Sequence, residues 1–456
     1  MPNSMLHDKN GGPSAQESIV PLKRQNRRLI VYGFIAVACI YFFNQCITLT
    51  QEFETSSTHS TTFERPPALG NCIQESAWSS PQFEVHLPAG SLSPRLTKVA
   101  SLHAFAILNI PLPTNPADLA QTAIGFISQH WPGTFKVITS PHQTQDTITL
   151  NVSTRYNTPG FLTSHSVRVC ENNGWIEIYN PALKLGETTR ADIMHLGMFD
   201  TTLIFPESDD SVSPPPMMRK FHAYTPDTEI IIGDAGSKLG FRRVIFNGNK
   251  TIEVNSLSTE RAIITSYGGT IRGTFNVSAT LTLTTSNSPI IVDLNLNNTQ
   301  GGVLSVFATT TNSPIEITAS LFSILPPQPP GFSISATTTN SPVDISFLTA
   351  PLDSSLQVKA VTTNSPAIVN AHPTYQGGFF LDNEGPELHE NRGAVVDPSG
   401  EGRERRFEYT AVRQDLVAGK VFWGESPRPR PHFPWPNIFE EMIRVSTTNS
   451  PAVLNF

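Results

Sequence analysis

The second half of the chain repeats one pattern of apolar and polar residues around a corner of sequence Asn-Ser-Pro. The asparagines of the five copies are Asn287, Asn312, Asn340, Asn364 and Asn449. Counted from each asparagine, positions +3, +5 and +7 are apolar, positions −4 and −6 are apolar, and position −2 is threonine. Apolar residues at every second position on both sides of a fixed corner predict two strands that bury one face and are joined by a tight turn.

The spacing of the corners predicts how these strands are arranged. The asparagines are 25, 28, 24 and 85 residues apart, and a period near 25 is typical of a solenoid with one coil per repeat. Coils stacked at the ~4.8 Å interstrand spacing would align the asparagines, so that their amides form a hydrogen-bonded ladder. We attribute the 28-residue step to a loop at Leu325–Gly331 and the 85-residue step to an insertion at about 372–440. Within that insertion Gly378–Leu381, Arg406–Ala411 and Lys420–Trp423 still have strand patterns. Repeated edge hairpins of a β-sandwich are the alternative interpretation.

The chain before the repeat has a mixed pattern and predicts a small α+β or mostly β unit over residues 71–205. Apolar residues at helical spacing predict a helix over Pro116–His130, with Asn115 as its cap. Strands are expected at Thr147–Val152, Ser166–Val169 and Trp175–Tyr179, with a hairpin turn at 172–174 between the last two. Residues 206–219, rich in Pro, Ser and Asp, predict a linker to a β-repeat domain over 220–456.

An uncharged apolar segment lies near the N-terminus, at Leu29–Leu49. As a helix its length would match the ~30 Å hydrocarbon core of a bilayer. Basic residues precede it and acidic residues follow it, which predicts a cytoplasmic tail over 1–28 and an outer side beyond residue 50. A Ser/Thr-rich stalk over 50–70 would follow. A cleaved signal peptide and a buried core helix are the alternatives. The sequence therefore predicts a single-pass membrane protein whose ectodomain is extracellular or lumenal.

Glycosylation sequons and cysteines are compatible with that placement. Four acceptor sequons, at Asn151, Asn249, Asn276 and Asn297, all lie on the predicted outer side. Two of the four cysteines fall in the apolar segment, which leaves Cys72 and Cys170 outside it. An oxidising compartment would let these two form a disulfide, and two buried free thiols are the alternative.

Composition and motifs narrow the function classes. The chain has 456 residues, a net charge of −7 and only 15% charged residues, which argues against nucleic acid as a partner because such binders cluster Lys and Arg. The twelve histidines show no metal-ligand spacing, and no P-loop, dinucleotide or nucleophile-elbow motif occurs. We therefore predict no catalytic, cofactor-binding or metal-binding residues, and no cofactor.

One pair of acids is the exception worth testing. Glu316 and Asp344 occupy the same position, +4, in consecutive coils, so stacking would bring the two carboxylates together. Such a pair could form a cation site or the two carboxylates of a retaining glycosidase. The other interpretation is two solvated acids on an exposed face.

The chain resembles membrane-anchored proteins of higher, basidiomycete-type fungi that carry Thr-Thr-Asn-(Ser/Ala)-Pro corners and have no assigned activity. It is also similar, more distantly, to adhesin-like β-solenoid domains of bacteria. The likeness rests on residues 250–371 and 445–456 and on the apolar segment, and it implies no catalytic residues. Our first hypothesis is a non-catalytic, membrane-anchored surface protein for display or adhesion, with the lipid bilayer at 29–49 and a cell-wall glycan or surface protein as partners. The alternative is a carbohydrate-active enzyme on a β-helix, by analogy of fold alone.

Overall fold

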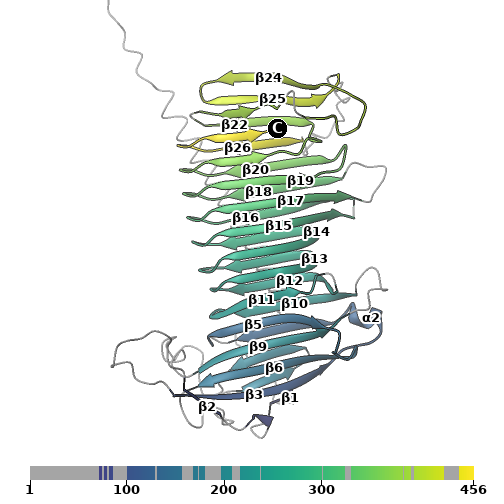
Figure 1. The fold of residues 1–456 in the computed structure, drawn as a ribbon, viewed down its shortest axis with the longest axis vertical. Helices are drawn as coiled ribbons and strands as arrows, with labels where there is room; N and C mark the ends of the chain where they lie inside the picture. Colours follow the sequence, from purple (N-terminus) through teal and green to yellow (C-terminus); the bar gives the residue numbers. More distant parts are fainter. Residues whose placement is uncertain are drawn as a thin grey trace, which may run out of the picture. The chain divides into compact units, whose positions relative to one another are not determined.

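The structure, a computed structural model, describes fifteen stretches of the chain. They are residues 71–73, 77–79, 82–85, 100–128, 131–156, 168–172, 174–179, 197–207, 216–236, 238–299, 301–323, 330–383, 385–391, 395–425 and 441–456. All of them belong to one compact unit, Leu69–Phe456. The described residues of this unit contain 27 strands in one hydrogen-bonded network, in which most pairings are parallel (Figure 1).

The parallel strands form two ladders. In stacking order, the first ladder contains β8 (Trp175–Tyr179), β4 (Ala123–Ser128), β10 (Met217–Thr225), β12 (Gly240–Gly248), the second halves of β13 (Ile252–Ser266) and β14 (Ile271–Thr285), β16 (Val303–Thr309), β18 (Gly331–Thr337), β20 (Ser355–Val361), β26 (Met442–Ser446) and β22 (Gly377–Asp382). The second contains β9 (Gly197–Pro206), β5 (Gly133–Ser140), β11 (Thr228–Asp234), the first halves of β13 and β14, β15 (Ile290–Asn298), β17 (Ile315–Ser323), β19 (Val343–Thr349), β21 (Ala367–Asn370), β27 (Ala452–Asn455) and β23 (Glu387–His389). Each coil contributes one strand to each ladder, which is the arrangement of a β-solenoid.

Antiparallel strands cover both ends of the stack. At the end formed by earlier residues they are β1 (Asn71–Cys72), β7 (Arg168–Asn172), β2 (Gln82–Val85), β3 (Ala100–Pro111) and β6 (Thr147–Tyr156). At the other end the hairpin of β24 (Arg405–Arg413) and β25 (Leu416–Trp423) pairs with β22. Such caps protect the parallel edges from pairing with another chain.

The two ladders enclose a single hydrophobic core. Inward residues alternate with outward ones, as in β15, where Ile290, Val292, Leu294 and Leu296 are buried. Phenylalanines fill the early coils: the Phe221 ring lies 5.2 Å from that of Phe241 and 5.3 Å from that of Phe246. The period-2 pattern of the sequence therefore corresponds to one buried face per strand.

The asparagine corners form the column that the repeat predicts. Each asparagine after Asn287 donates its Nδ2 to the Oδ1 of the preceding asparagine of the series, at 2.8, 2.7, 2.6 and 2.7 Å from Asn312 to Asn449. The threonines at position −2 are buried, and their hydroxyls donate to carbonyls inside the corners; that of Thr362, for example, reaches the Ser341 carbonyl at 2.9 Å. The asparagine amides on the outside and the threonine hydroxyls on the inside together hold the five Asn-Ser-Pro corners in register.

The last coil does not follow chain order. Strand β26 lies between β20 and β22, and β27 lies between β21 and β23. Residues 442–455 thus occupy a layer between two coils that precede them in the chain. The inserted residues 372–425 form the outermost coil and the capping hairpin, with the three strands expected there present as β22, β24 and β25.

The predicted fold class is wrong in two respects. The expected helix over Pro116–His130 is limited to α2 (Pro116–Leu119), whose start is capped by the Asn115 Oδ1 at 3.0 Å from the Ala117 amide. Strand β4 follows it, because Ala123–Ser128 can pair in parallel with both β8 and β10 and bury Ile124 and Phe126. The small unit is thus part of the same β stack, and the stacking of parallel coils excludes the β-sandwich.

The second correction concerns the N-terminal transmembrane helix. The structure supports a β stack with almost no helix and gives that element no support. Within the stretches that the structure describes, every helix is too short to cross a membrane. The expected tail, apolar segment and stalk, residues 1–70, lie outside those stretches.

Candidate binding face

The outer surface of β14, β16 and β18 is an uncharged array of hydroxyls. We call it the hydroxyl face and define it by the outward residues Thr282, Thr284, Ser305, Phe307, Thr309, Ser333, Ser335 and Thr337. They lie in register, with Thr284 beside Thr309 and Thr309 beside Thr337. Parallel strand geometry spaces such side chains by about 4.8 Å between strands and about 6.6 Å along a strand. The face is therefore a regular polar grid.

Most of these hydroxyls are available to a ligand. Within the described part of the chain, only the Ser333 hydroxyl donates to another side chain, the Oε1 of Gln357 at 3.4 Å. One aromatic ring interrupts the grid, that of Phe307, which is 40% exposed. An exposed ring among hydroxyls offers an apolar surface for the face of a sugar ring and hydrogen-bond partners for its hydroxyls.

The outer surface of the second ladder carries the predicted acid pair. Glu316 and Asp344 are register neighbours on β17 and β19, as the repeat predicts. The Asp344 carboxylate accepts hydrogen bonds from the Ser346 hydroxyl and the Asn370 amide at 3.3 and 3.4 Å. The same column continues through Ile291 on one side and Ile368 on the other. Within the described stretches no three His, Cys, Asp or Glu side chains are grouped to hold a metal ion.

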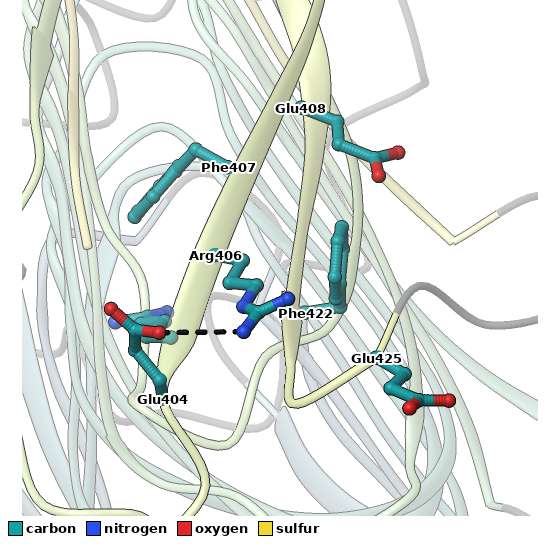
Figure 2. Close-up of a pocket in the computed structure, with 7 residues that line it drawn as sticks. Glu404, Arg406, Phe407, Glu408, Phe422 and Glu425 are labelled. Atoms are coloured by element: carbon teal, nitrogen blue, oxygen red, sulfur yellow. Dashed lines mark ion pairs between the residues drawn. The ribbon is translucent and has the colours of Figure 1, made fainter.

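A hollow of about 400 Å³ opens on the capping hairpin (Figure 2). It is lined by Glu404, Arg405, Arg406, Phe407, Glu408, Phe422 and Glu425. The Glu404 carboxylate pairs with the Arg406 guanidinium at 3.5 Å, and both side chains are more than half exposed. Ion pairs of this kind contribute little to stability. The lining is predominantly charged, so the hollow suits a small polar ligand and supplies few apolar contacts.

Arg405 is the most buried charged residue of that lining and is 4% exposed. Its guanidinium carbon is 5.2 Å from the Phe456 ring centroid, 5.5 Å from that of Trp423 and 5.9 Å from that of Phe407. No nitrogen of the guanidinium has a hydrogen-bond partner in the described residues. Burial lowers the pKa of Arg405 to about 10, so the group remains cationic at neutral pH. The three rings replace hydrogen bonds with cation–π contacts and tie the capping hairpin to the last coil.

The structure places the four sequons in different surroundings. Asn297 is exposed near the end of β15, and Asn249 lies at the corner between β12 and β13. The Asn151 Oδ1 is buried on β6. The Nδ2 of Asn276 donates to the hydroxyls of two serines of β13 at 3.3 and 3.2 Å, and its Oδ1 accepts from Asn295 at 2.8 Å. A glycan on Asn276 would therefore break a partly buried hydrogen-bond network, whereas the exposed Asn297 could carry one without such a cost.

Cys72 and Cys170 form a disulfide between β1 and β7. These two strands are register neighbours at the end of the stack formed by earlier residues. Strand β7 continues into β8 through a turn in which Gly174 has a φ of 82°. The positive φ explains why glycine ends this hairpin turn.

The sequence predicts a neutral Thr/Ser/Asn surface on the repeat but does not specify which strands present it. Thr and Ser at alternating positions of β14, β16 and β18 form that surface in the structure. The hollow has no sequence pattern, because it depends on how one hairpin pairs with β22.

Comparisons with known proteins do not identify a family for this chain. No family model matches the chain, and no curated protein matches it. One solved structure that it is similar to is a protein of Clostridium sporogenes, provisionally described as a cell adhesion protein. The likeness covers 77% of this chain and 98% of that one, at 10% identity and a TM-score of 0.15. At this score the likeness does not extend to a shared site or activity.

Proposed function

We propose that this protein is a non-catalytic surface module for adhesion or display, which binds a neutral cell-wall glycan or a surface protein through the hydroxyl face. The observation that carries the proposal is the grid itself: an uncharged, regular array of available hydroxyls around one exposed phenylalanine, on a stack held rigid by the asparagine column. A pre-ordered face loses little conformational entropy on binding, and this favours weak but repeated contacts with a polymer.

The disulfide and the sequons support an extracellular or lumenal location for this module. Disulfides persist in oxidising compartments, and Cys72 and Cys170 are joined in the structure. Occupancy of Asn297 would test this location. We expect the Asn297→Gln variant to lose a mobility shift on glycosidase treatment that the Asn276→Gln variant keeps.

The alternative function, a carbohydrate-active enzyme, requires a different placement of the acid pair. A glycosidase needs its two acids on either side of the scissile bond, inside a cleft that surrounds the sugar. Glu316 and Asp344 instead lie on the outer surface of two neighbouring strands, with Ile291 and Ile368 completing their column. This arrangement favours binding over hydrolysis at that position.

The test uses the full chain on an array of purified cell-wall polysaccharides and surface proteins. We expect retention on at least one neutral polysaccharide or protein without release of reducing ends. Thr309→Glu, in the middle of the hydroxyl face, should abolish retention. Thr318→Glu, an outward threonine on the second ladder, is the matched control and should leave retention unchanged. Absence of retention, equal loss in both variants, or release of reducing ends would contradict the proposal.

A further inference from the structure

A group of five cations lies on the first ladder, close to the capped end with the disulfide. We call it the basic bulge cluster and define it by Arg219 and Lys220 on β10, Arg242 and Arg243 on β12, and Arg261 on β13. The chain as a whole has a net charge of −7, so this concentration of positive charge is local.

Stacked bulges create the cluster. In each of the three strands two consecutive residues point outward between two buried ones: Arg219 and Lys220 stand between Met218 and Phe221, and the other two pairs are Arg242 with Arg243 and Glu260 with Arg261. The register aligns Lys220 with Arg243 and Arg243 with Arg261. A bulge inserts one extra residue, so at this level each strand presents two outward side chains instead of one, and five of the six are cationic.

These cations have no anionic partner among the described residues. Two outward cations elsewhere on the stack do have an anionic partner: Arg272 contacts Glu253 at 2.6 Å and Arg155 contacts Asp200 at 2.9 Å. Glu260, within the bulges, forms no ion pair with them in the described stretches. Like charges are neighbours here, because Lys220 and Arg243 are register partners. Burial, together with the charges of Arg243 and Arg219, lowers the pKa of Lys220. An anion would relieve this repulsion.

Aromatic groups and hydroxyls adjoin the cluster. The Lys220 Nζ lies 6.0 Å from the centroid of the Trp175 ring, and Tyr224, farther along the same strand, is 42% exposed. The register column of Lys220, Arg243 and Arg261 continues through Thr280 into Ser305 of the hydroxyl face. A polymer lying along the stack would therefore meet cations first and hydroxyls next.

We propose that the basic bulge cluster binds the anionic groups of an acidic polysaccharide that runs along the stack onto the hydroxyl face. The proposal goes beyond the proposed function, because it adds an acidic polysaccharide to the neutral glycan or surface protein proposed for the hydroxyl face. A polysaccharide fits better than an isolated anion because the cations are repeated at the ~4.8 Å strand spacing and rings for sugar stacking lie beside them. It fits better than nucleic acid because the disulfide lies in β1 and β7, next to the strand that carries Trp175, and indicates an oxidising compartment.

The experiment measures binding of the full chain to four labelled polymers by fluorescence polarisation, at several salt concentrations. Polygalacturonate carries carboxylates, heparin carries sulfates as well, dextran is neutral and duplex DNA carries phosphates. We expect at least one acidic polysaccharide to bind more tightly than dextran. The affinity for that acidic polysaccharide should fall as the salt concentration rises. Preference between the first two polymers identifies carboxylate or sulfate as the recognised group.

Two charge-reversal variants make the test specific. The Arg242→Glu/Arg243→Glu variant should weaken acidic-polysaccharide binding by about tenfold or more. Lys136→Glu/Arg413→Glu makes the same change in net charge at exposed cations outside the cluster and should change it by less than about twofold. Equal loss in both variants, no preference over dextran, or tighter binding of DNA would overturn the proposal. Thr309→Glu reports neutral-ligand retention separately, so failure of the cluster and failure of the hydroxyl face are distinguishable.

Discussion

Removal of one side-chain amide from the asparagine column measures how much the hydrogen bonds of that column contribute to the stability of the stack. Asn340 takes part in two of its bonds, donating to Asn312 at 2.7 Å and accepting from Asn364 at 2.6 Å. Asn287, at the first position, takes part in one, as acceptor from Asn312 at 2.8 Å. The net contribution of one hydrogen bond to the free energy of unfolding is about 0.5–1.5 kcal/mol. Because these corners are exposed, values near the lower end of that range apply. We expect the free energy of unfolding to fall by about 1–2 kcal/mol in Asn340→Ala and about half as much in Asn287→Ala.

The assay is urea unfolding of the full chain followed by circular dichroism, with the shift in midpoint multiplied by a common slope. A double-mutant cycle measures the contribution of the bond that two neighbouring asparagines share. Asn312→Ala and Asn340→Ala each remove two bonds, but together they remove three, because they share one. The double variant should therefore lose about 0.5–1 kcal/mol less than the sum of the single losses. Strict additivity, or equal effects of Asn287→Ala and Asn340→Ala, would refute the reasoning.

Three further predictions concern the early coils. Cys72→Ser/Cys170→Ser should lower stability by about 2–5 kcal/mol in urea unfolding, because the disulfide joins residues 98 apart; an unchanged midpoint would contradict this. Gly125→Ala should lower the free energy of unfolding by about 1–3 kcal/mol, because the added Cβ would overlap the indole ring of Trp175, whereas Gly302→Ala, which meets nothing within 4 Å, should be neutral. Burial, with two neighbouring cations, lowers the pKa of His222 from 6.5 to about 4. The unfolded state then binds more protons between these values, so stability should be complete above pH 6.5 and fall by about 3 kcal/mol towards pH 4. The variant His222→Gln should flatten that part of the pH profile, and an unchanged profile would contradict the assignment.

The repeated half of the fold could be predicted from the sequence because its corners repeat both identity and phase. Five coils of that half use the same Thr-x-Asn-Ser-Pro corner, and the outermost coil, formed by β22 and β23, lacks it. The earlier coils reach the same geometry with other residues. The Thr225 hydroxyl donates to the Thr228 carbonyl, and the Ser266 hydroxyl to that of Lys250, so both take the place of the buried corner threonines. Without a shared asparagine these coils did not stand out as repeats.

Two features depended on pairing that no local pattern specifies. Ala123–Ser128 has helical and strand patterns at once, and its parallel neighbours β8 and β10 determine that it is a strand. The layer position of β26 depends on which free edge the last coil meets, and its corner has the same Thr-x-Asn-Ser-Pro sequence as the other repeats, so the motif does not specify that edge. Of the candidate surfaces, the acid pair followed from register, whereas the basic bulge cluster required knowledge of where the bulges align.

Disulfide trapping between engineered cysteines tests most directly whether the coils stack in the order described. Lys359 on β20 and Arg444 on β26 are register neighbours, and Phe380 on β22 lies on the far side of Arg444. Neighbouring strands bring Cα atoms to about 5 Å, within reach of a disulfide, whereas strands two apart are separated by about 9–10 Å. We predict rapid oxidation of Lys359→Cys/Arg444→Cys, and none of Lys359→Cys/Phe380→Cys, relative to the single variants. Trapping of the second pair in place of the first would show that the last coil is not inserted between its neighbours.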